Sequence, residues 1–165
     1  MIILGIDPGI AIVGWGVLRY EKGKFTPIAF GSIQTKAGQK VEDRLNQVFD
    51  ALTAIIDKYH PDVMAIEELF WNTNQKTGIV VAEARGVILL TCNKLLGDEV
   101  YEYTPNQIKM TITGYGGAEK KQMQLMVQAL LRLKAIPRPD DAADALAVAL
   151  CHGQVAGMAG QFRVK

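Results

Sequence analysis

The segment that decides the fold is MIILGID, residues 1–7, in which a run of apolar residues ends on a carboxylate, Asp7. Such a run predicts a buried strand. A carboxylate at its end is costly to bury, because an unpaired ion in apolar surroundings is strongly destabilising or takes up a proton. Asp7 therefore needs a compensating group. Mg²⁺ or Mn²⁺ is one candidate, since both ions prefer carboxylate oxygens.

The rest of the chain alternates strand and helix patterns around this strand. Apolar, β-branched and aromatic residues predict strands over residues 2–7, 11–20, 24–34, 63–67 and 99–103. Helical periodicity predicts helices over residues 41–59, 78–96, 118–133 and 140–151, with a polar loop over 71–77. The first three strands are joined by short turns and predict an antiparallel meander. The whole order predicts an α/β fold with a five-stranded mixed sheet flanked by helices.

Two more carboxylates lie near the start of the last predicted helix. Asp141 and Asp144 are three residues apart, so their side chains share one helix face. Asp140 and Asp141 have a second explanation, because acidic residues after Pro139 would cap the helix and interact favourably with its dipole. Asp144 lies in the second turn among alanines, where that explanation does not apply.

The fourth candidate carboxylate lies at the end of the strand predicted over residues 63–67. Glu67 and Glu68 alternate across this strand, so only one of them can face the same side as Asp7. Periodicity alone does not choose between them.

The composition predicts one compact domain. The chain has 165 residues, of which 49% are hydrophobic, and this is enough for a proper core. We expect one domain over residues 1–152 and a flexible C-terminal tail over 153–165. No cationic leader or membrane-length apolar stretch precedes the first strand, so we expect a cytoplasmic protein. Cys92 and Cys151 are expected to be reduced core residues, and the two histidines lack zinc-ligand spacing.

Charge is unevenly distributed along the chain. The whole chain carries a net charge of +1, but residues 104–138 carry six basic residues against Glu119 alone, so the remainder carries −4. The six are Lys109, Lys120, Lys121, Arg132, Lys134 and Arg138. A basic face opposite an acidic site is typical of a metal-dependent enzyme that acts on a polyanion. A few solvated lysines on a helix are the simpler alternative.

Taken together, the motifs resemble those of the RuvC Holliday-junction resolvases, a family of the retroviral-integrase and ribonuclease H superfamily. The resemblance covers nearly the whole chain. It rests on these motifs in this order: ILGIDPG (3–9) with GWGV (14–17), AIEELF (65–70), EARGV (83–87), AEK (118–120) and DAADALA (141–147). A ribonuclease H-like fold is what this resemblance implies.

The resemblance also implies a catalytic and metal-binding set. Asp7, Glu67, Asp141 and Asp144 correspond to the acidic residues of the family, which favours Glu67 over Glu68. Some members carry His where this chain has Asp141. The implied cofactor is two Mg²⁺ ions per subunit, with Mn²⁺ as a possible substitute, acting on either side of the scissile phosphate.

The activity implied is that of a structure-selective endonuclease in homologous recombination and DNA repair. It would resolve four-way junctions by paired, symmetric nicks that leave a 5′-phosphate and a 3′-hydroxyl. The branch-migration proteins RuvA and RuvB are the implied partners. The cleavage consensus and the surface on which these partners dock leave no signal in the sequence.

Five residues are candidate DNA contacts. Phe70 matches the aromatic of the family at this position and, with Trp71, can stack on bases; one of the two rings is alternatively a core residue. Lys76 lies in the polar loop that follows. Arg85 either contacts DNA or braces the Phe70 loop. Lys109 matches a basic position of the family.

The last of the five, Lys120, also matches a basic position and follows a glycine-rich loop. GYGG (114–117) leads into the helix predicted from residue 118. Free amides at that helix start can accept a phosphate, with Lys120 adding charge.

A homodimer is expected because a four-way junction has approximate two-fold symmetry and needs two matched sites. The helix predicted over residues 78–96 is apolar on more than one face. One face can cover the sheet and another a second subunit. The alternative is a helix buried within a monomer.

Three other functions fit parts of the pattern. GIDPG (5–9) also resembles the phosphate-binding hairpin of actin-like sugar kinases and ATPases, but these enzymes need two such lobes and this chain has one. A non-catalytic junction-binding module would not need the complete carboxylate set. Nucleases that trim ribosomal RNA precursors share the first strand, but Phe70 and the motif over residues 141–146 fit a resolvase better.

Overall fold

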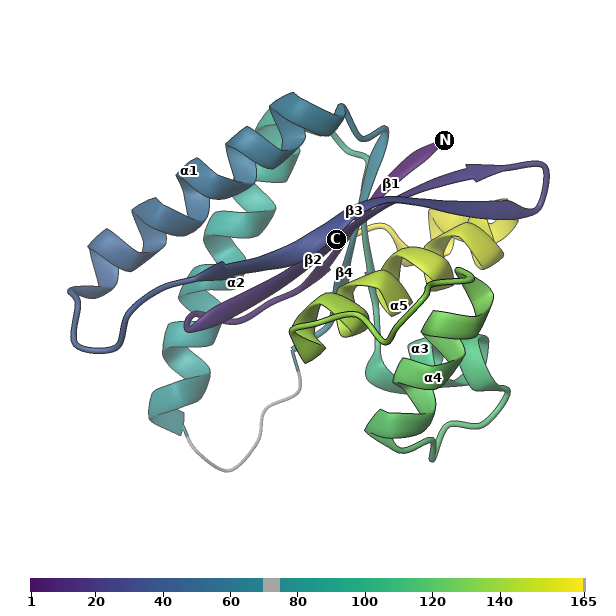
Figure 1. Cartoon of the computed structure of the whole chain (residues 1–165). Helices are drawn as coiled ribbons and strands as arrows, with labels where there is room; N and C mark the ends of the chain where they lie inside the picture. The colour runs from purple at the N-terminus through teal and green to yellow at the C-terminus, as the bar shows by residue number, and fades with distance from the viewer. Residues whose placement is uncertain (70–74, 165) are drawn as a thin grey trace.

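A computed structural model describes residues 1–69 and 75–164 of the chain (Figure 1). The strands are β1 (Ile2–Asp7), β2 (Ile12–Glu21), β3 (Lys24–Gln34), β4 (Val63–Glu67) and β5 (Val100–Tyr103). The helices are α1 (Val41–Tyr59), α2 (Gln75–Leu96), α3 (Pro105–Thr113), α4 (Lys120–Leu130) and α5 (Asp140–Val155), followed by the 3₁₀ helix η1 (Ala156–Phe162).

The strands form one mixed sheet in the order β3-β2-β1-β4-β5. β1 to β3 pair antiparallel, whereas β4 pairs parallel with both β1 and β5. The predicted α/β fold, five-stranded mixed sheet and antiparallel meander are confirmed. Helices α1 and α2 cover one face of the sheet, and α5 with α3 and α4 covers the other (Figure 1).

Helix α5 approaches the sheet through three glycines. A Cβ added at Gly5 would collide with the carbonyl oxygen of Ala145, and one added at Gly14 would collide with that of Asp141. A Cβ at Gly16 would lie 2.7 Å from Cδ2 of Leu146. Because these strand positions carry no side chain, the backbone of α5 lies almost directly on β1 and β2.

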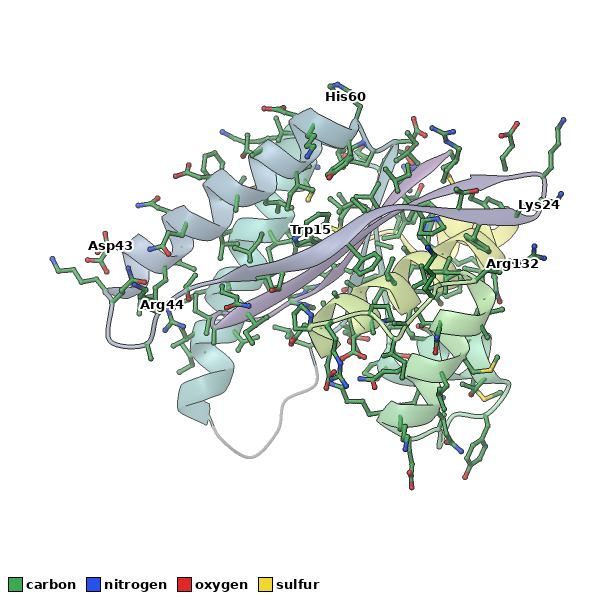
Figure 2. The ribbon with its side chains drawn as sticks, viewed as in Figure 1. Trp15, Lys24, Asp43, Arg44, His60 and Arg132 are labelled. Atoms are coloured by element: carbon green, nitrogen blue, oxygen red, sulfur yellow. The ribbon has the colours of Figure 1, made fainter. Side chains whose placement is uncertain are left out.

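The opposite face is filled by larger side chains. Leu4 and Ile6 of β1 are fully buried there together with Leu52 of α1 and Ile88 of α2. Trp15 points from β2 toward α1 (Figure 2), and its ring centroid lies 6.0 Å from that of Tyr59. This face is a conventional apolar layer between a sheet and two helices.

The sequence missed one helix. Residues 105–113, for which the sequence predicted neither helix nor strand, form α3. A capping box fixes the start of this helix. The Thr104 hydroxyl accepts a hydrogen bond from the Gln107 backbone at 3.1 Å, and the Gln107 side chain accepts one from the Thr104 backbone at 2.8 Å. Threonine, proline and glutamine at the N-cap, first and third positions were the available signal.

Several helix boundaries differ from the predicted ones. Helix α2 begins at Gln75, so the end of the predicted loop is helical, and α4 spans Lys120–Leu130 rather than residues 118–133. Helix α5 continues to Val155. The domain boundary expected at residue 152 therefore falls inside α5.

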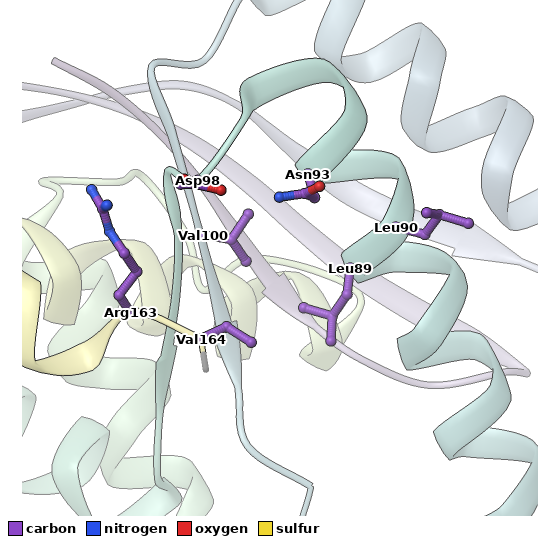
Figure 3. Close-up of a pocket in the computed structure, with 7 residues that line it drawn as sticks. All are labelled: Leu89, Leu90, Asn93, Asp98, Val100, Arg163 and Val164. Carbon is purple, nitrogen blue, oxygen red and sulfur yellow. The ribbon is translucent and has the colours of Figure 1, made fainter.

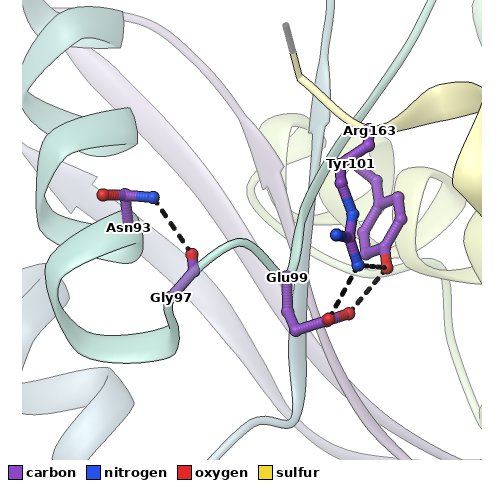
Figure 4. A network of polar contacts seen from close by, with 5 residues as sticks. All are labelled: Asn93, Gly97, Glu99, Tyr101 and Arg163. Atoms are coloured by element: carbon purple, nitrogen blue, oxygen red, sulfur yellow. Dashed lines mark hydrogen bonds and ion pairs between the residues drawn. The ribbon is translucent and has the colours of Figure 1, made fainter.

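The C-terminal segment lies against the edge strand β5. Arg163 donates hydrogen bonds to Glu99 at 2.8 Å and to the Tyr101 hydroxyl at 3.3 Å (Figure 4), and the Val164 backbone donates to Val100 at 3.0 Å. A pocket of about 460 Å³ separates this segment from Leu89 and the end of α2 (Figure 3). These contacts extend the sheet by a short antiparallel bridge, while flexibility of residues 153–165 stays a prediction.

Two smaller expectations concern the thiols and membrane spans. Cys92 and Cys151 are free and buried, as predicted for reduced core residues. Over residues 1–69 and 75–164, no helix combines the length and apolarity that a membrane crossing requires.

Candidate active site

Asp7 and Glu67 meet because they end neighbouring parallel strands. Ile6 pairs with Ile66, so the next residues of β1 and β4 lie side by side at the carboxyl edge of the sheet. Residues 3 and 5 of β1, and residues 63 and 65 of β4, face α5. Strict alternation then directs Asp7 and Glu67 to the α5 face. Glu68 follows the last residue of β4 and is exposed.

Asp141 and Asp144 reach the same edge from α5. Gly14 pairs with Asp7 across β1 and β2, and the Asp141 backbone packs directly on Gly14. One helical turn further along α5, Asp144 lines a pocket together with Glu67. The structure thus brings Asp7, Glu67, Asp141 and Asp144 together, although they come from three distant parts of the sequence.

The electrostatics of the site reflect this crowding. Burial raises the pKa of Asp7 to about 8, and the negative charges of its three carboxylate neighbours add to the effect. Burial raises the pKa of Glu67 to about 7, with the Asp144 charge as the next cause. The pKa of Asp144 is also raised, mainly by burial. Near neutral pH the site therefore attracts protons or other cations.

The missed helix α3 builds one wall of the site. A pocket of about 200 Å³ lies between α3, α4 and α5, and it is lined by Glu67, Pro105, Ile108, Lys109, Lys120, Met123, Asp144 and Ala147. The Lys120 ammonium lies 3.1 Å from Oδ2 of Asp144 and 3.9 Å from Oδ2 of Asp140. The charge of Lys109 lowers the pKa of Glu67. Two of the predicted basic residues thus face the carboxylates.

The donor set fits a hard divalent cation. All four side chains offer carboxylate oxygens, which Mg²⁺ and Mn²⁺ prefer, and burial leaves their charge poorly compensated. In the described part of the chain, no three His, Cys, Asp or Glu side chains are already close enough to hold a metal ion. The chemistry of the ligands fits a metal, but they do not form a closed cage.

Arg85 lies away from this pocket. Its Nη2 atom is 2.6 Å from Oε2 of Glu102, so the ion pair joins α2 to β5. The side chain is partly buried, with 21% of its surface exposed. The structure thus gives Arg85 a bracing contact between a helix and a strand.

Two of the five candidate DNA contacts, Phe70 and Lys76, have no described side chain. Phe70 lies outside the described residues, as does Trp71, and Lys76 is described only as backbone in the first turn of α2.

The start of α4 differs from the prediction, and a phosphate contact there stays a prediction. Gly114 instead ends α3 in a left-handed conformation with φ 73°. Helix α4 begins at Lys120, and the Glu119 backbone amide donates to the Gln122 side chain at 2.9 Å. Glu119 at the N-cap puts a negative charge where a phosphate was expected, which disfavours an anion there.

Comparisons with known proteins agree with this architecture. A family model described as crossover junction endodeoxyribonuclease RuvC matches residues 3–152. The chain is 55% identical to a protein of that name from Brevibacillus brevis over 154 residues, covering 93% of this chain and 92% of the relative. It is 50% identical to one from Alkaliphilus metalliredigens over 165 residues, covering 100% of both.

Solved structures give the same result. A Thermus thermophilus RuvC structure matches with a TM-score of 0.88 and 33% identity, covering 99% of each chain. T. thermophilus RuvC in complex with Holliday junction substrate matches with a TM-score of 0.88 and 30% identity, again covering 99% of each chain.

Proposed function

The chain belongs to the crossover junction endodeoxyribonuclease RuvC family, and from this premise we propose that it resolves four-way DNA junctions. It acts as an endonuclease that makes paired, symmetric nicks in homologous recombination and DNA repair. The observation that supports this most directly is the gathering of four carboxylates at one edge of the sheet, where burial and the charges of the other three raise the pKa of Asp7 to about 8.

Asp7, Glu67, Asp141 and Asp144 are proposed to hold two Mg²⁺ ions per subunit, with Mn²⁺ as a substitute. When bound, such ions lower the pKa of an attacking water and stabilise the leaving oxygen. Asp7 would be the central residue of this ligand set, because the charges of the other three carboxylates all act on it. In-line attack then leaves a 5′-phosphate and a 3′-hydroxyl.

The proposed DNA contacts surround this site. Lys109 and Lys120 line the pocket with Glu67 and would attract the phosphates of the scissile strand. Phe70 is proposed to stack on bases at the crossover, and Lys76, further along the same segment, is proposed as a second DNA contact. Arg85 is proposed to act on this loop or on DNA from its position against Glu102.

A homodimer is proposed to supply the two sites that paired nicks need. Helix α2 supports this, because Ala84, Ile88 and Cys92 are buried against the sheet while Leu90 is 59% exposed and Ile79 is 54% exposed. An apolar face left uncovered on a helix marks a candidate interface. The proposal includes a bacterial cytoplasmic location and the RuvA–RuvB complex as partner.

The test is incubation of a labelled synthetic four-way junction with and without Mg²⁺, with linear duplex and single-strand controls. Paired, ligatable nicks on opposite arms are expected only with metal. Binding without cleavage would point to a structural junction-binding module. Equal cleavage of linear DNA would point to another nucleic-acid substrate.

Asp7→Asn is expected to abolish cleavage while junction binding survives, because the amide keeps the shape of the side chain but removes its charge. Glu68→Gln is the matched control, since Glu68 directly follows β4 and is exposed. Retained cleavage in Asp7→Asn would contradict the proposed metal site.

A further inference from the structure

Lys120 occupies a position that a DNA contact alone does not explain. Its ammonium contacts the carboxylate of Asp144 directly, 3.1 Å from Oδ2, and lies 3.9 Å from Asp140. Among the described side chains, Lys120 is the cation whose charge lowers the pKa of Asp7, of Glu67 and of Asp144 alike. In the metal-free site, it therefore neutralises part of the carboxylate charge.

The contact is also easy to break. The Lys120 side chain is 55% exposed, and Asp144 keeps 29% of its surface in solvent. Ion pairs this exposed are weak, because water screens them and the long lysine side chain loses freedom on pairing. A divalent cation brings twice the charge and prefers carboxylate oxygens, so it would compete effectively for Asp144.

We propose that Lys120 is the resident cation of the metal-free site, and that it exchanges its Asp144 partner for a DNA phosphate when a divalent cation binds. This proposal rests on the metal-dependent function proposed above. Lys120 then has two partners in turn, a carboxylate without metal and a phosphate with it. The exchange frees a positive charge for DNA at the moment when the site becomes able to cleave.

Removal of the Lys120 charge should change metal binding and DNA binding in opposite directions. Removal of a competing cation strengthens metal binding in the absence of DNA. Removal of a phosphate contact weakens binding and cleavage of DNA. A lysine that only contacts DNA would leave metal affinity unchanged.

The experiment is calorimetric titration of the full chain with Mn²⁺ and with Mg²⁺ in the absence of DNA. Lys120→Met is expected to bind metal about two- to fivefold more tightly than the unaltered protein, which is the size of a surface ion pair. Lys121→Met is the matched control, because Lys121 is the next residue of α4 and is exposed. Its metal affinity is expected to match that of the unaltered protein.

A second control tests whether metal affinity depends on the Lys120–Asp144 contact or on any positive charge that repels the metal ion. Lys109 lines the same pocket and its charge lowers the pKa of Glu67, but the described contacts include no ion pair between Lys109 and a carboxylate. Lys109→Met is therefore expected to change metal affinity less than Lys120→Met does. An equal or larger effect of Lys109→Met would overturn the exchange, as would unchanged or weaker metal binding by Lys120→Met.

Thermal unfolding gives an independent readout. Metal-free Lys120→Met is expected to unfold at a lower temperature than metal-free Lys121→Met, and saturating metal is expected to remove the difference. If the unaltered protein binds no metal and Asp7→Asn behaves identically, the proposed function fails together with this inference. If the unaltered protein binds metal and Lys120→Met matches it in both measurements, only the inference fails.

Discussion

The two faces of the sheet are built by opposite means. On the α5 face, Gly5 and Gly14 let the strand backbone lie against the backbone of α5, and Gly16 lies against the Leu146 side chain. On the α1 and α2 face, Leu4, Ile6 and Ile88 are fully buried and fill a thick apolar layer.

The difference explains why the candidate site lies on one face only. Asp141 and Asp144 are carried to Asp7 by a helix whose height over the sheet is set by glycine contacts with backbone atoms. A layer of leucine and isoleucine side chains would keep the helix further away and would adjust to small changes. The glycine contacts fix the distance of α5 from the sheet, while apolar clusters on both faces supply stability.

The largest expected effect is at Gly5. Gly5→Val is expected to prevent folding, because its side chain would collide with the backbone of Ala145 and Ala149, which cannot rotate away. Circular dichroism and thermal unfolding would show the loss. Gly5→Ala is the milder variant and is expected to cost about 3 kcal/mol in free energy of unfolding. A fully stable Gly5→Val protein would contradict the close approach.

The matching change on the other face is Ile88→Ala. Ile88 is fully buried, so truncation should leave a cavity and lower the free energy of unfolding by about 2–5 kcal/mol. Urea denaturation measures this loss. Cleavage per folded molecule is expected to stay unchanged, because no backbone contact of α5 is disturbed. Loss of cleavage without loss of stability would contradict the different roles of the two faces.

The site itself is expected to destabilise the metal-free protein as pH rises. Asp7 has a pKa of about 8 in the folded chain against an ordinary value of 3.8. Between these values the folded state holds a proton that the unfolded state has released, so stability falls as pH increases. Asp7→Asn removes this pH-dependent loss of stability. Its melting temperature at pH 8, without metal, is expected to exceed that of the unaltered protein by roughly 5 °C.

Scanning calorimetry between pH 5 and pH 8, in a chelating buffer, would test this. The two proteins are expected to differ least near pH 5, where Asp7 is protonated in the fold. A difference that grows toward low pH would have the wrong sign.

The smallest expected effect is at Gly86, on the exposed side of α2. A Cβ there meets no atom within 4 Å. Gly86→Ala is therefore expected to raise the free energy of unfolding by about 0.5–1 kcal/mol, because alanine favours helix and restricts the unfolded chain. Urea denaturation at low protein concentration measures it. A loss of stability that appears only at high concentration would indicate that a second subunit packs on this position.

Much of the fold follows from local patterns. Helix α1, β3 and β4 begin and end where periodicity and turn residues predict, because their apolar patterns are long and their boundaries are clear. Helix α3 was not predicted because it is short and only its capping residues indicate it. The start of α4 was predicted two residues too early, because a glycine-rich loop does not reveal where the next helix begins.

The sequence by itself determined the α/β class, the family motifs and four candidate carboxylates. The tertiary structure decided how they meet. Strand alternation alone left Glu67 and Glu68 equivalent and the family resemblance favoured Glu67, while the structure shows that α5 covers the face on which Asp7 and Glu67 lie. Nothing in the sequence showed that α3 lines the site or that Lys120 contacts Asp144. Periodicity is a local property, whereas the face that a helix covers depends on contacts between segments far apart in the chain.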